Sequence, residues 1–381
     1  MHTGLEVLLS EGLPEMTGKR VGLVTNHTGV DSWFRSTADL LHASDQFRLV
    51  ALFGPEHGVR GEAQAGVEVG ASVDGRTGLL VYSLYGETRR PTPAMLERMD
   101  ALLFDIQDVG VRYATYISTM SLVQEACAEA GIPLVLLDRP NPISGVHIEG
   151  PSLNPAFASF VGAHPIPVRH GLTCGELARL FAAERGWPTP TVVPMQGWRR
   201  DQWYDETGLP WVQPTPNLPT LDSLTLYPGM CLIEGTNVSE GRGTTRPFEL
   251  VGAPWLDPFE LAAELERRTL PGFAFRPAYF TPTYSKHAGF SCRGVQAYVT
   301  DRSEVRPVEL GVHLLHAIRE LAPEEFAWRS GHDGSFFVDL LYGSDKLRRM
   351  LDGGAGVAEI TADWREETSG FRERRDPFLL Y

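Results

Sequence analysis

Several turns in the first third of the chain carry carboxyl, imidazole or phenol groups beside glycine. In the turn at residues 54–58, Glu56 and His57 follow an apolar stretch that ends at Phe53. A carboxyl group at the apolar end of a strand is partly desolvated, which favours the neutral acid that can protonate a leaving group. Glu56 is therefore a candidate general acid, although the turn is equally explained if Glu56 only caps a neighbouring helix. Neither residue has partners at helical metal-ligand spacing, so we expect no metal site.

A second group of polar residues surrounds the end of the apolar run at 101–106. Asp105 and Asp108 are three residues apart, and they could bind sugar hydroxyl groups or position a catalytic group. The alternative is structural, with Asp108 capping the helix that follows. Tyr113 and Tyr116 lie at the start of that helix, where they either pack in the core or offer a ligand a ring face or a phenolic proton.

Similar residues follow the other apolar runs. Asp138 and Arg139 could form a plain ion pair, or they could bind a ligand together with Asn141. Further candidates in such turns are Asn26, Arg60 and Arg112. Because the carboxyl ends of parallel strands meet at one edge of a sheet, we expect these side chains to converge there.

A regular framework has to position these side chains, and the apolar pattern predicts one. Short apolar runs alternate with amphipathic segments, which is typical of a parallel sheet covered by helices on both faces. We expect strands at residues 20–26, 47–53, 79–85, 101–106, 133–138 and 191–195, with helices at 36–43, 116–130 and 174–185. This is a Rossmann-like, doubly wound α/β layout.

The pattern changes after a stretch that precludes regular structure, since four prolines lie between residues 210 and 219. We therefore divide the chain into domains 1–218 and 219–381. The second, smaller domain is expected to be α+β. Its predicted helices lie at 258–268, 308–321 and 345–351, and its predicted strands at 273–280, 294–299 and 336–341.

Composition excludes some partners. The 381 residues include 34 Lys and Arg against 48 Asp and Glu, a net charge of −14. An acidic chain repels a phosphate backbone, so we expect no nucleic-acid partner. The four cysteines are widely spaced and are expected to be buried thiols rather than disulfides. No membrane span or basic leader is evident, so we expect a cytoplasmic protein with no membrane partner.

The fingerprints of several enzyme classes are missing. The first apolar run leads into Thr25-Asn26-His27 instead of G-x-G-x-x-G, which argues against a dinucleotide, and we expect no cofactor. The segment 234–248 is rich in glycine but lacks the G-K-[ST] ending of a phosphate-binding loop. The G-x-S-x-G elbow of a serine hydrolase is also absent.

Four longer motifs together are similar to those of one enzyme family. They are G-P-E-H-G-x-R-G at 54–61, D-x-Q-D-V-G-x-R-x-x-T-Y at 105–116, L-D-R-P-N-P at 137–142 and E-G-T-N-x-S-x-G-R-G-T-x-x-P-F at 234–248. In them the chain resembles the exo-β-N-acetylmuramidases of the NamZ type. The resemblance implies a Rossmann-like catalytic domain, a smaller domain that closes the cleft, and release of terminal non-reducing N-acetylmuramic acid from peptidoglycan fragments. Members are often exported, whereas this chain shows no leader.

The resemblance also implies roles for motif residues. Glu56 is expected to be the leading catalytic carboxylate. The second catalytic group stays open between Asp105, Asp108, a tyrosine such as Tyr116, and the substrate's own 2-acetamido group. The candidates for binding muropeptides or MurNAc-GlcNAc oligosaccharides are Asn26, His57, Arg60, Arg112, Tyr113, Asp138, Asn141, Glu240 and Arg242.

Muramic acid carries a lactyl carboxylate, which suits the fork of an arginine side chain. Among the arginines of these turns, we expect Arg60 or Arg242 to bind it. Two other functions remain possible, a non-catalytic muropeptide-binding protein and a sugar-nucleotide or nicotinamide oxidoreductase on the same fold. Turnover of a muramide, compared with reaction with NAD(P)H, separates the three.

Overall fold

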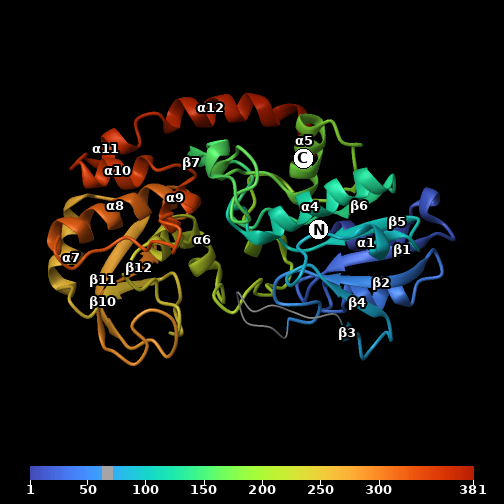
Figure 1. Cartoon of the computed structure of the whole chain (residues 1–381), viewed down its shortest axis with the longest axis horizontal. Helices are drawn as coiled ribbons and strands as arrows, with labels where there is room; N and C mark the ends of the chain where they lie inside the picture. The colour runs from blue at the N-terminus through green and yellow to red at the C-terminus, as the bar shows by residue number, and fades with distance from the viewer. Residues whose placement is uncertain (62–71) are drawn as a thin grey trace.

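The computed structural model describes residues 1–61 and 72–381. Its largest element is a seven-stranded sheet with the order β3-β4-β2-β1-β5-β6-β9, in which only β3 runs antiparallel to its neighbour (Figure 1). The strands are β1 (Arg20–Thr25), β2 (Arg48–Gly54), β3 (Ser72–Val73), β4 (Leu80–Ser83), β5 (Ala101–Asp105), β6 (Leu134–Leu137) and β9 (Thr191–Val193). The chain builds outward from β1 first through β2 and β4 and then through β5 and β6, which is the predicted doubly wound topology.

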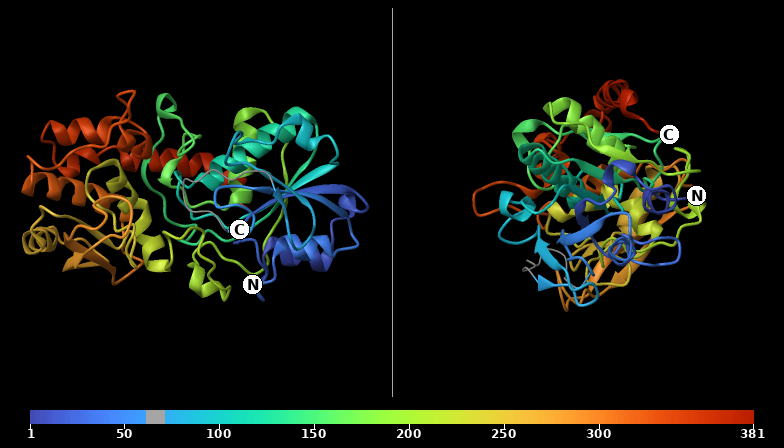
Figure 2. Two further views of the ribbon diagram at one scale, coloured as in Figure 1. Left: turned by 60° about the horizontal axis from the view of Figure 1, so that its bottom comes forward. Right: turned by 90° about the vertical axis from the view of Figure 1, so that its right-hand side faces the viewer.

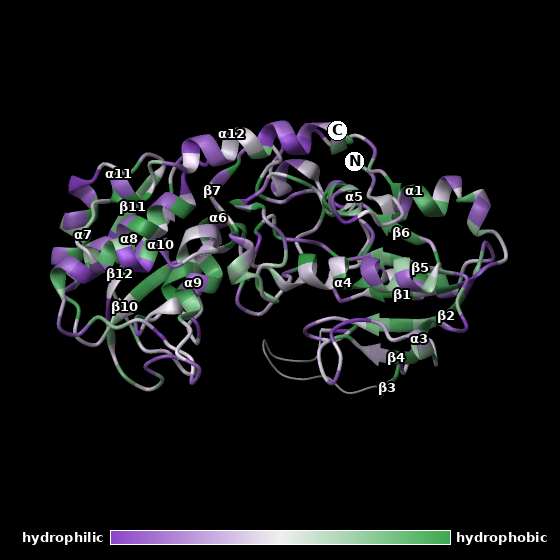
Figure 3. Cartoon of the chain, turned by 45° about the horizontal axis from the view of Figure 1, so that its top comes forward, coloured by the Kyte–Doolittle hydropathy of each residue, from purple (hydrophilic) through white to green (hydrophobic). Residues whose placement is uncertain are grey.

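Helices cover both faces of this sheet. They are α1 (Gly4–Glu11) and α2 (Thr37–His42) on one face, with α3 (Pro93–Leu96), α4 (Thr115–Ala130) and α5 (Cys174–Arg185) on the other. Alternation along β5 explains this, because Leu103 packs into the cluster of α1 and α2 while Leu102 and Phe104 pack into that of α4 and α5. Figure 3 shows the apolar strands between these layers. The predicted strands and helices of this half are confirmed to within two residues.

The rest of the chain forms a smaller unit beside the first (Figure 1). It contains a three-stranded antiparallel sheet with the order β10-β12-β11. Its strands are β10 (Leu250–Ala253), β11 (Phe273–Phe280) and β12 (Cys292–Val299), and its helices are α6 (Leu221–Met230), α7 (Pro258–Arg267), α8 (Pro307–Leu321), α9 (Phe337–Tyr342), α10 (Lys346–Asp352) and α11 (Val357–Ile360). The chain therefore has a two-domain α/β fold, and the boundary after residue 218 stays a prediction.

Some short elements connect the larger ones. A separate two-stranded antiparallel sheet is formed by β7 (Glu149–Ser152) and β8 (Pro167–Arg169). The short 3-10 turns are η1 (Pro14–Met16), η2 (Pro155–Phe157), η3 (Tyr204–Thr207), η4 (Cys231–Gly235) and η5 (Asp376–Phe378).

The strand predicted at 336–341 is wrong, because this segment forms helix α9. A short apolar run fits either a buried strand or a buried helix. Here Val338, Leu341 and Tyr342 are all buried, and their spacing of three and four residues places them on one helical face. The segment packs against η4. This tertiary contact favours the helix over the strand, a choice that the apolar run alone does not settle.

The last helix returns the chain to the first domain. Helix α12 (Trp364–Arg375) crosses from the smaller unit to the larger one (Figures 1 and 2). The hydroxyl group of the last residue, Tyr381, then donates a hydrogen bond to Asp138 Oδ2 (2.8 Å). All four cysteines are buried free thiols, as predicted. In the part of the chain that the structure describes, no helix has the length and apolar character needed to cross a bilayer.

Candidate active site

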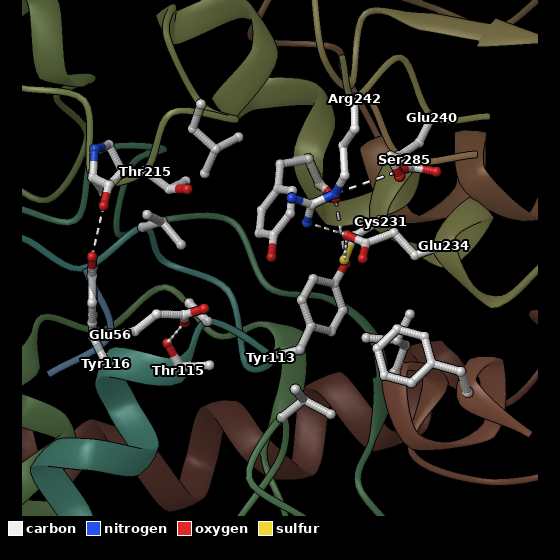
Figure 4. A pocket seen from close by; sticks show the side chains of 18 of the residues that line it. Glu56, Tyr113, Thr115, Tyr116, Thr215, Cys231, Glu234, Glu240, Arg242 and Ser285 are labelled. Carbon is white, nitrogen blue, oxygen red and sulfur yellow. Dashed lines mark hydrogen bonds and ion pairs between the residues drawn. The ribbon is translucent and has the colours of Figure 1, made fainter. Parts of the chain in front are cut away.

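A cavity of about 440 Å³ lies beside the N-terminal end of α4, where the two domains meet (Figure 4). One side is formed by residues that follow β2 and β4 and by the start of α4, among them Glu56, His57, Tyr85, Thr115 and Tyr116. The other side comes from the smaller unit and includes Cys231, Glu234, Glu240, Arg242, Ser285, Lys286 and Arg329. The cavity therefore combines segments that are more than 200 residues apart in the sequence.

Glu56 is held on the wall of this cavity by the turn that follows β2. The turn is tight, and His57 adopts a left-handed backbone conformation with φ of 75°. Thr115, the first residue of α4, donates a hydrogen bond from Oγ1 to Glu56 Oε2 (2.7 Å). Tyr85 lies on the same wall, and burial together with the charge of Glu56 raises its pKa. The half-buried Glu56 carboxyl group is thus fixed in orientation while it faces the cavity.

Two predicted tyrosines also line the cavity, but their hydroxyl groups are engaged by backbone. Tyr116 donates to the carbonyl oxygen of Pro214 (2.6 Å), and burial raises its pKa. Tyr113 donates to the carbonyl oxygen of Pro228. The rings are therefore positioned as cavity walls, and neither phenol is arranged as a proton donor toward the centre (Figure 4).

The opposite wall carries a network of charges. Arg242 Nη2 lies 2.8 Å from Glu234 Oε1, and its Nε lies 3.3 Å from Glu240 Oε1. Lys286 Nζ pairs with Glu240 Oε2 (2.8 Å) and donates to the carbonyl oxygen of Ile233 (2.9 Å). Burial opposes the charge of Arg242, yet the two carboxylates raise the pKa of its guanidinium group. Arg242 and Glu240 therefore build the wall by pairing with each other and with their neighbours.

Arg329 is a further cation on this wall. Its guanidinium group lies over the ring of Phe337, 5.1 Å from the ring centre. Within the described residues no carboxylate pairs with it. It is thus available to a ligand anion in a way that Arg242 is not.

Several predicted site residues lie at the sheet edge without lining the cavity. Asp105 is fully buried, where it accepts hydrogen bonds from Thr37 Oγ1 and from Arg139 Nη2 (2.8 Å). Asp108 accepts one from the amide of Gly110 (2.7 Å), and burial raises its pKa to about 6. The structure thus keeps both carboxylates away from the cavity and engages them within the fold.

The remaining strand-end residues also support the fold. Asp138 accepts hydrogen bonds from Thr173 Oγ1 (2.7 Å) and from the amide of Gly175 (2.9 Å), at the start of α5. Asn141 donates from Nδ2 to the carbonyl oxygen of Leu172 (2.9 Å). Asn26 accepts from the amide of Thr28 (2.9 Å). These contacts fix the turns around the sheet edge.

Two of the predicted arginines lie elsewhere too. Arg112 is almost fully buried, and its two terminal nitrogens donate to four carbonyl oxygens, including those of Pro151 (2.7 Å) and Tyr342 (2.8 Å). Arg60 pairs with Asp74 and Asp39 at 2.8 Å each, and these contacts raise its pKa. Neither side chain lines the cavity.

The cavity therefore unites Glu56, His57, Tyr113, Tyr116, Glu240 and Arg242, and it adds residues that sequence reasoning missed. Thr115 and Glu234 lie inside two of the four motifs, so the sequence contained a signal that could have identified them. Lys286 and Arg329 lie in segments without a motif, and only the tertiary fold brings them in. Among the residues that the structure describes, no three or more His, Cys, Asp and Glu side chains form a group suited to a metal ion.

Comparison with known proteins gives matches along the whole chain. Residues 21–222 match the model "Exo-beta-N-acetylmuramidase NamZ, N-terminal", and residues 225–381 match the corresponding C-terminal model. The peptidoglycan beta-N-acetylmuramidase NamZ of Bacillus subtilis (strain 168) is 50% identical over 382 aligned positions, covering 100% of this chain and 91% of the relative.

Two solved structures from Bacteroides fragilis NCTC 9343, both described as DUF1343 family proteins, have the same fold. One superposes with a TM-score of 0.91 at 39% identity and the other with 0.80 at 32%. Each alignment covers 100% of this chain and 98% of the other. With both family models matched in order across nearly all its residues, the chain belongs to the NamZ family of exo-beta-N-acetylmuramidases.

Proposed function

We propose that this chain is an exo-acting glycoside hydrolase that releases terminal non-reducing N-acetylmuramic acid from peptidoglycan fragments. Support comes from the 50% identity to a peptidoglycan beta-N-acetylmuramidase over the full chain. The two alternatives, a silent muropeptide-binding protein and a nicotinamide oxidoreductase, are not favoured by this relationship. The substrates are accordingly muropeptides or MurNAc-GlcNAc oligosaccharides.

The observation that carries the mechanism is the oriented carboxyl group of Glu56 on the wall of a sugar-sized cavity. In its neutral form Glu56 protonates the glycosidic oxygen as the bond from that oxygen to the anomeric carbon breaks. The hydrogen bond from Thr115 to Oε2 holds this carboxyl group in place. Water then adds to the anomeric carbon, returns a proton to the Glu56 carboxylate and supplies the hydroxyl group of the released sugar.

For the second catalytic group we propose the substrate's own 2-acetamido oxygen, which attacks the anomeric carbon. Glu234 and Glu240, the cavity's other carboxylates, are both held in ion pairs, which weakens them as nucleophiles. Asp105 and Asp108 lie outside the cavity. This route retains the anomeric configuration. Proton NMR of the first product should show the β-anomer, and release of the α-anomer would contradict it.

For the lactyl group we propose Arg329 in place of Arg60 and Arg242. A guanidinium group can pair with a carboxylate through two parallel hydrogen bonds. Arg329 lines the cavity, and its charge is not neutralised by a described carboxylate. Recognition of this group separates muramides from glucosaminides, which lack it.

We further propose that the enzyme works in the cytoplasm on salvaged wall fragments. The four buried free thiols fit a reducing compartment. Cell fractionation tests this location independently of the activity, and recovery of the protein outside the cell membrane would overturn it.

The activity itself is tested with a chromogenic β-N-acetylmuramide, the matching β-N-acetylglucosaminide and NAD(P)H. We expect chromophore release from the muramide, much slower release from the glucosaminide and no change in NAD(P)H absorbance. Tight muramide binding without release would point to the binding protein, and oxidation of NAD(P)H to the oxidoreductase.

A further inference from the structure

A second, smaller cavity of about 160 Å³ lies away from the catalytic one and shares no lining residue with it. Its walls come from the β7–β8 region, from the residue that precedes α8, and from α12. The charged residues that line it are Glu149, Arg169, Arg306 and Arg372. Three guanidinium groups and one carboxyl group therefore face a space too small for a sugar chain.

Arg169 is the buried member of this group, with 1% of its surface exposed. Its Nη2 donates to the carbonyl oxygen of Ile143, and its guanidinium plane lies 5.4 Å from the ring centre of Trp203. Its Nε and Nη1 have no hydrogen-bond acceptor among the described residues. A buried guanidinium N–H group without an acceptor lowers the stability of the fold. The two unpaired nitrogens of Arg169 therefore point to an acceptor that a ligand supplies.

The surroundings favour an oxygen-rich anion. Arg306 and Arg372 are exposed at the mouth of the cavity. The 15-residue helix α8 begins directly after Arg306, and the amide of Glu309 in its first turn donates to Glu149 Oε1 (2.9 Å). One oxygen of Glu149 thus serves the helix end, and the guanidinium groups are left to bind the anion.

Glu149 is the one acidic group, and it narrows the choice of anion. Its Oε2 is buried without a hydrogen-bond partner among the described residues. Burial raises the pKa of Glu149 to about 7, against the opposing effect of Arg169. An ionised Glu149 needs a donor from the ligand, and a hydrogen phosphate carries such a proton whereas sulfate at neutral pH does not.

We propose that this cavity binds inorganic phosphate in its hydrogen phosphate form. Arg169 donates from Nε and Nη1 to two of its oxygens, Arg306 and Arg372 bind the others at the mouth of the cavity, and Glu149 accepts a hydrogen bond from the protonated oxygen. Because these residues come from both sides of the predicted domain boundary, the anion ties the two domains together.

The first test titrates the whole chain calorimetrically at pH 8 with inorganic phosphate, glycerol 3-phosphate and sulfate. We expect saturable binding of inorganic phosphate. Sulfate and glycerol 3-phosphate both lack an acidic proton at this pH, so they should bind at least about 10-fold more weakly. Absence of saturable binding of inorganic phosphate, or equal binding of either of the other two anions, overturns the proposal.

The second test uses variants at the exposed mouth, which should fold normally. Arg306→Gln and Arg372→Gln should each weaken phosphate binding by about 10-fold or more. Arg365→Gln is the matched control. Arg365 lies on α12, as Arg372 does, but outside the cavity, so this variant removes one positive charge without touching the site. Equal weakening by the control would show only a general charge effect and would overturn the site.

The role of Glu149 has its own readout. Glu149→Gln replaces the proton acceptor by an amide of the same size that can also donate. This variant should bind sulfate about as well as phosphate, because the discrimination rests on that carboxylate. Unchanged discrimination in a folded Glu149→Gln variant would contradict the assigned ligand chemistry.

Discussion

Glu56 after β2 and Asp105 at the end of β5 stand at the same edge of one sheet, yet their surroundings differ. Asp105 is fully buried and is neutralised by Arg139, which donates two hydrogen bonds to it. Glu56 is half-buried on the cavity wall beside Thr115. A carboxylate paired with a buried cation is held inside the fold, and loss of either partner is costly, whereas a carboxylate that faces a cavity can act on a ligand. Exposure to the cavity, more than position at a strand end, distinguishes the two roles.

The largest effect is expected for Glu56→Gln, which keeps the size of the side chain but removes the proton donor. Turnover of a MurNAc-GlcNAc disaccharide should fall by about 10²–10⁴-fold, the usual contribution of a general acid. The free energy of unfolding and the affinity for substrate should change little. A large loss of stability in this variant would show that Glu56, like Asp105, is mainly a structural carboxylate.

Asp105→Asn should give the converse result. Breaking a buried ion pair leaves Arg139 uncompensated, so the free energy of unfolding should fall by about 3–5 kcal/mol. The folded fraction should keep near-normal turnover. Asp100→Asn is the control, since its pair with Arg20 is solvent-exposed, and it should change the free energy of unfolding far less. Denaturant titration measures both.

The sequence could predict the framework because the framework follows local rules. Hydrophobic periodicity alone identifies the apolar strands β1, β2 and β5 and the apolar face of α4. The sequence could also suggest Glu56, which stands in a long motif. It could not separate Glu56 from Asp105, because only the tertiary fold brings Arg139 to one carboxylate and a cavity to the other.

The same limit explains Lys286 and Arg329. Each lies in an irregular loop of the smaller unit, far along the chain from β2, and no periodicity marks it. The segment that became α9 was misjudged for a related reason, since its apolar run fits two structures until its packing partner is known.

Arg329→Gln extends the comparison to the opposite wall. Loss of a charge-assisted contact to the lactyl group should weaken binding of the muramide transition state by about 1.5–3 kcal/mol. The ratio of kcat/KM for the muramide to that for the glucosaminide should fall accordingly. The exposed Arg349, on α10, provides a charge-matched control through Arg349→Gln. An unchanged ratio would assign lactyl recognition to another residue.

Asp108 offers a pH-dependent contrast, because burial raises its pKa to about 6, well above the ordinary value of an aspartate. The folded state therefore binds the proton more tightly. The stability that this proton contributes is complete below about pH 4 and is lost as the pH rises through about 6. Asp108→Asn should gain about 1–3 kcal/mol relative to the wild type between pH 4.5 and 7.5. Parallel unfolding curves at both pH values would contradict this.

The smallest effect is expected for Thr115→Val, which removes the hydroxyl donor to Glu56 at nearly constant shape. A net hydrogen bond contributes about 1 kcal/mol, so kcat should fall by about fivefold with KM little changed. Thr119→Val, one turn further along α4, is the matched control because its hydroxyl group has no hydrogen-bond partner among the described residues and lies outside the cavity. Equal loss in both variants would indicate a general disturbance of the helix.

The central claim is that Glu56 acts as the catalytic acid, and dependence on the leaving group tests it most directly. Wild type and Glu56→Gln are compared on the MurNAc-GlcNAc disaccharide and on a nitrophenyl β-N-acetylmuramide. A sugar alkoxide must be protonated to leave, whereas a nitrophenolate leaves readily without a proton. We predict a loss of about 10²–10⁴-fold on the disaccharide and a far smaller loss on the aryl glycoside. Near-normal cleavage of the disaccharide by the variant would contradict the assignment of Glu56.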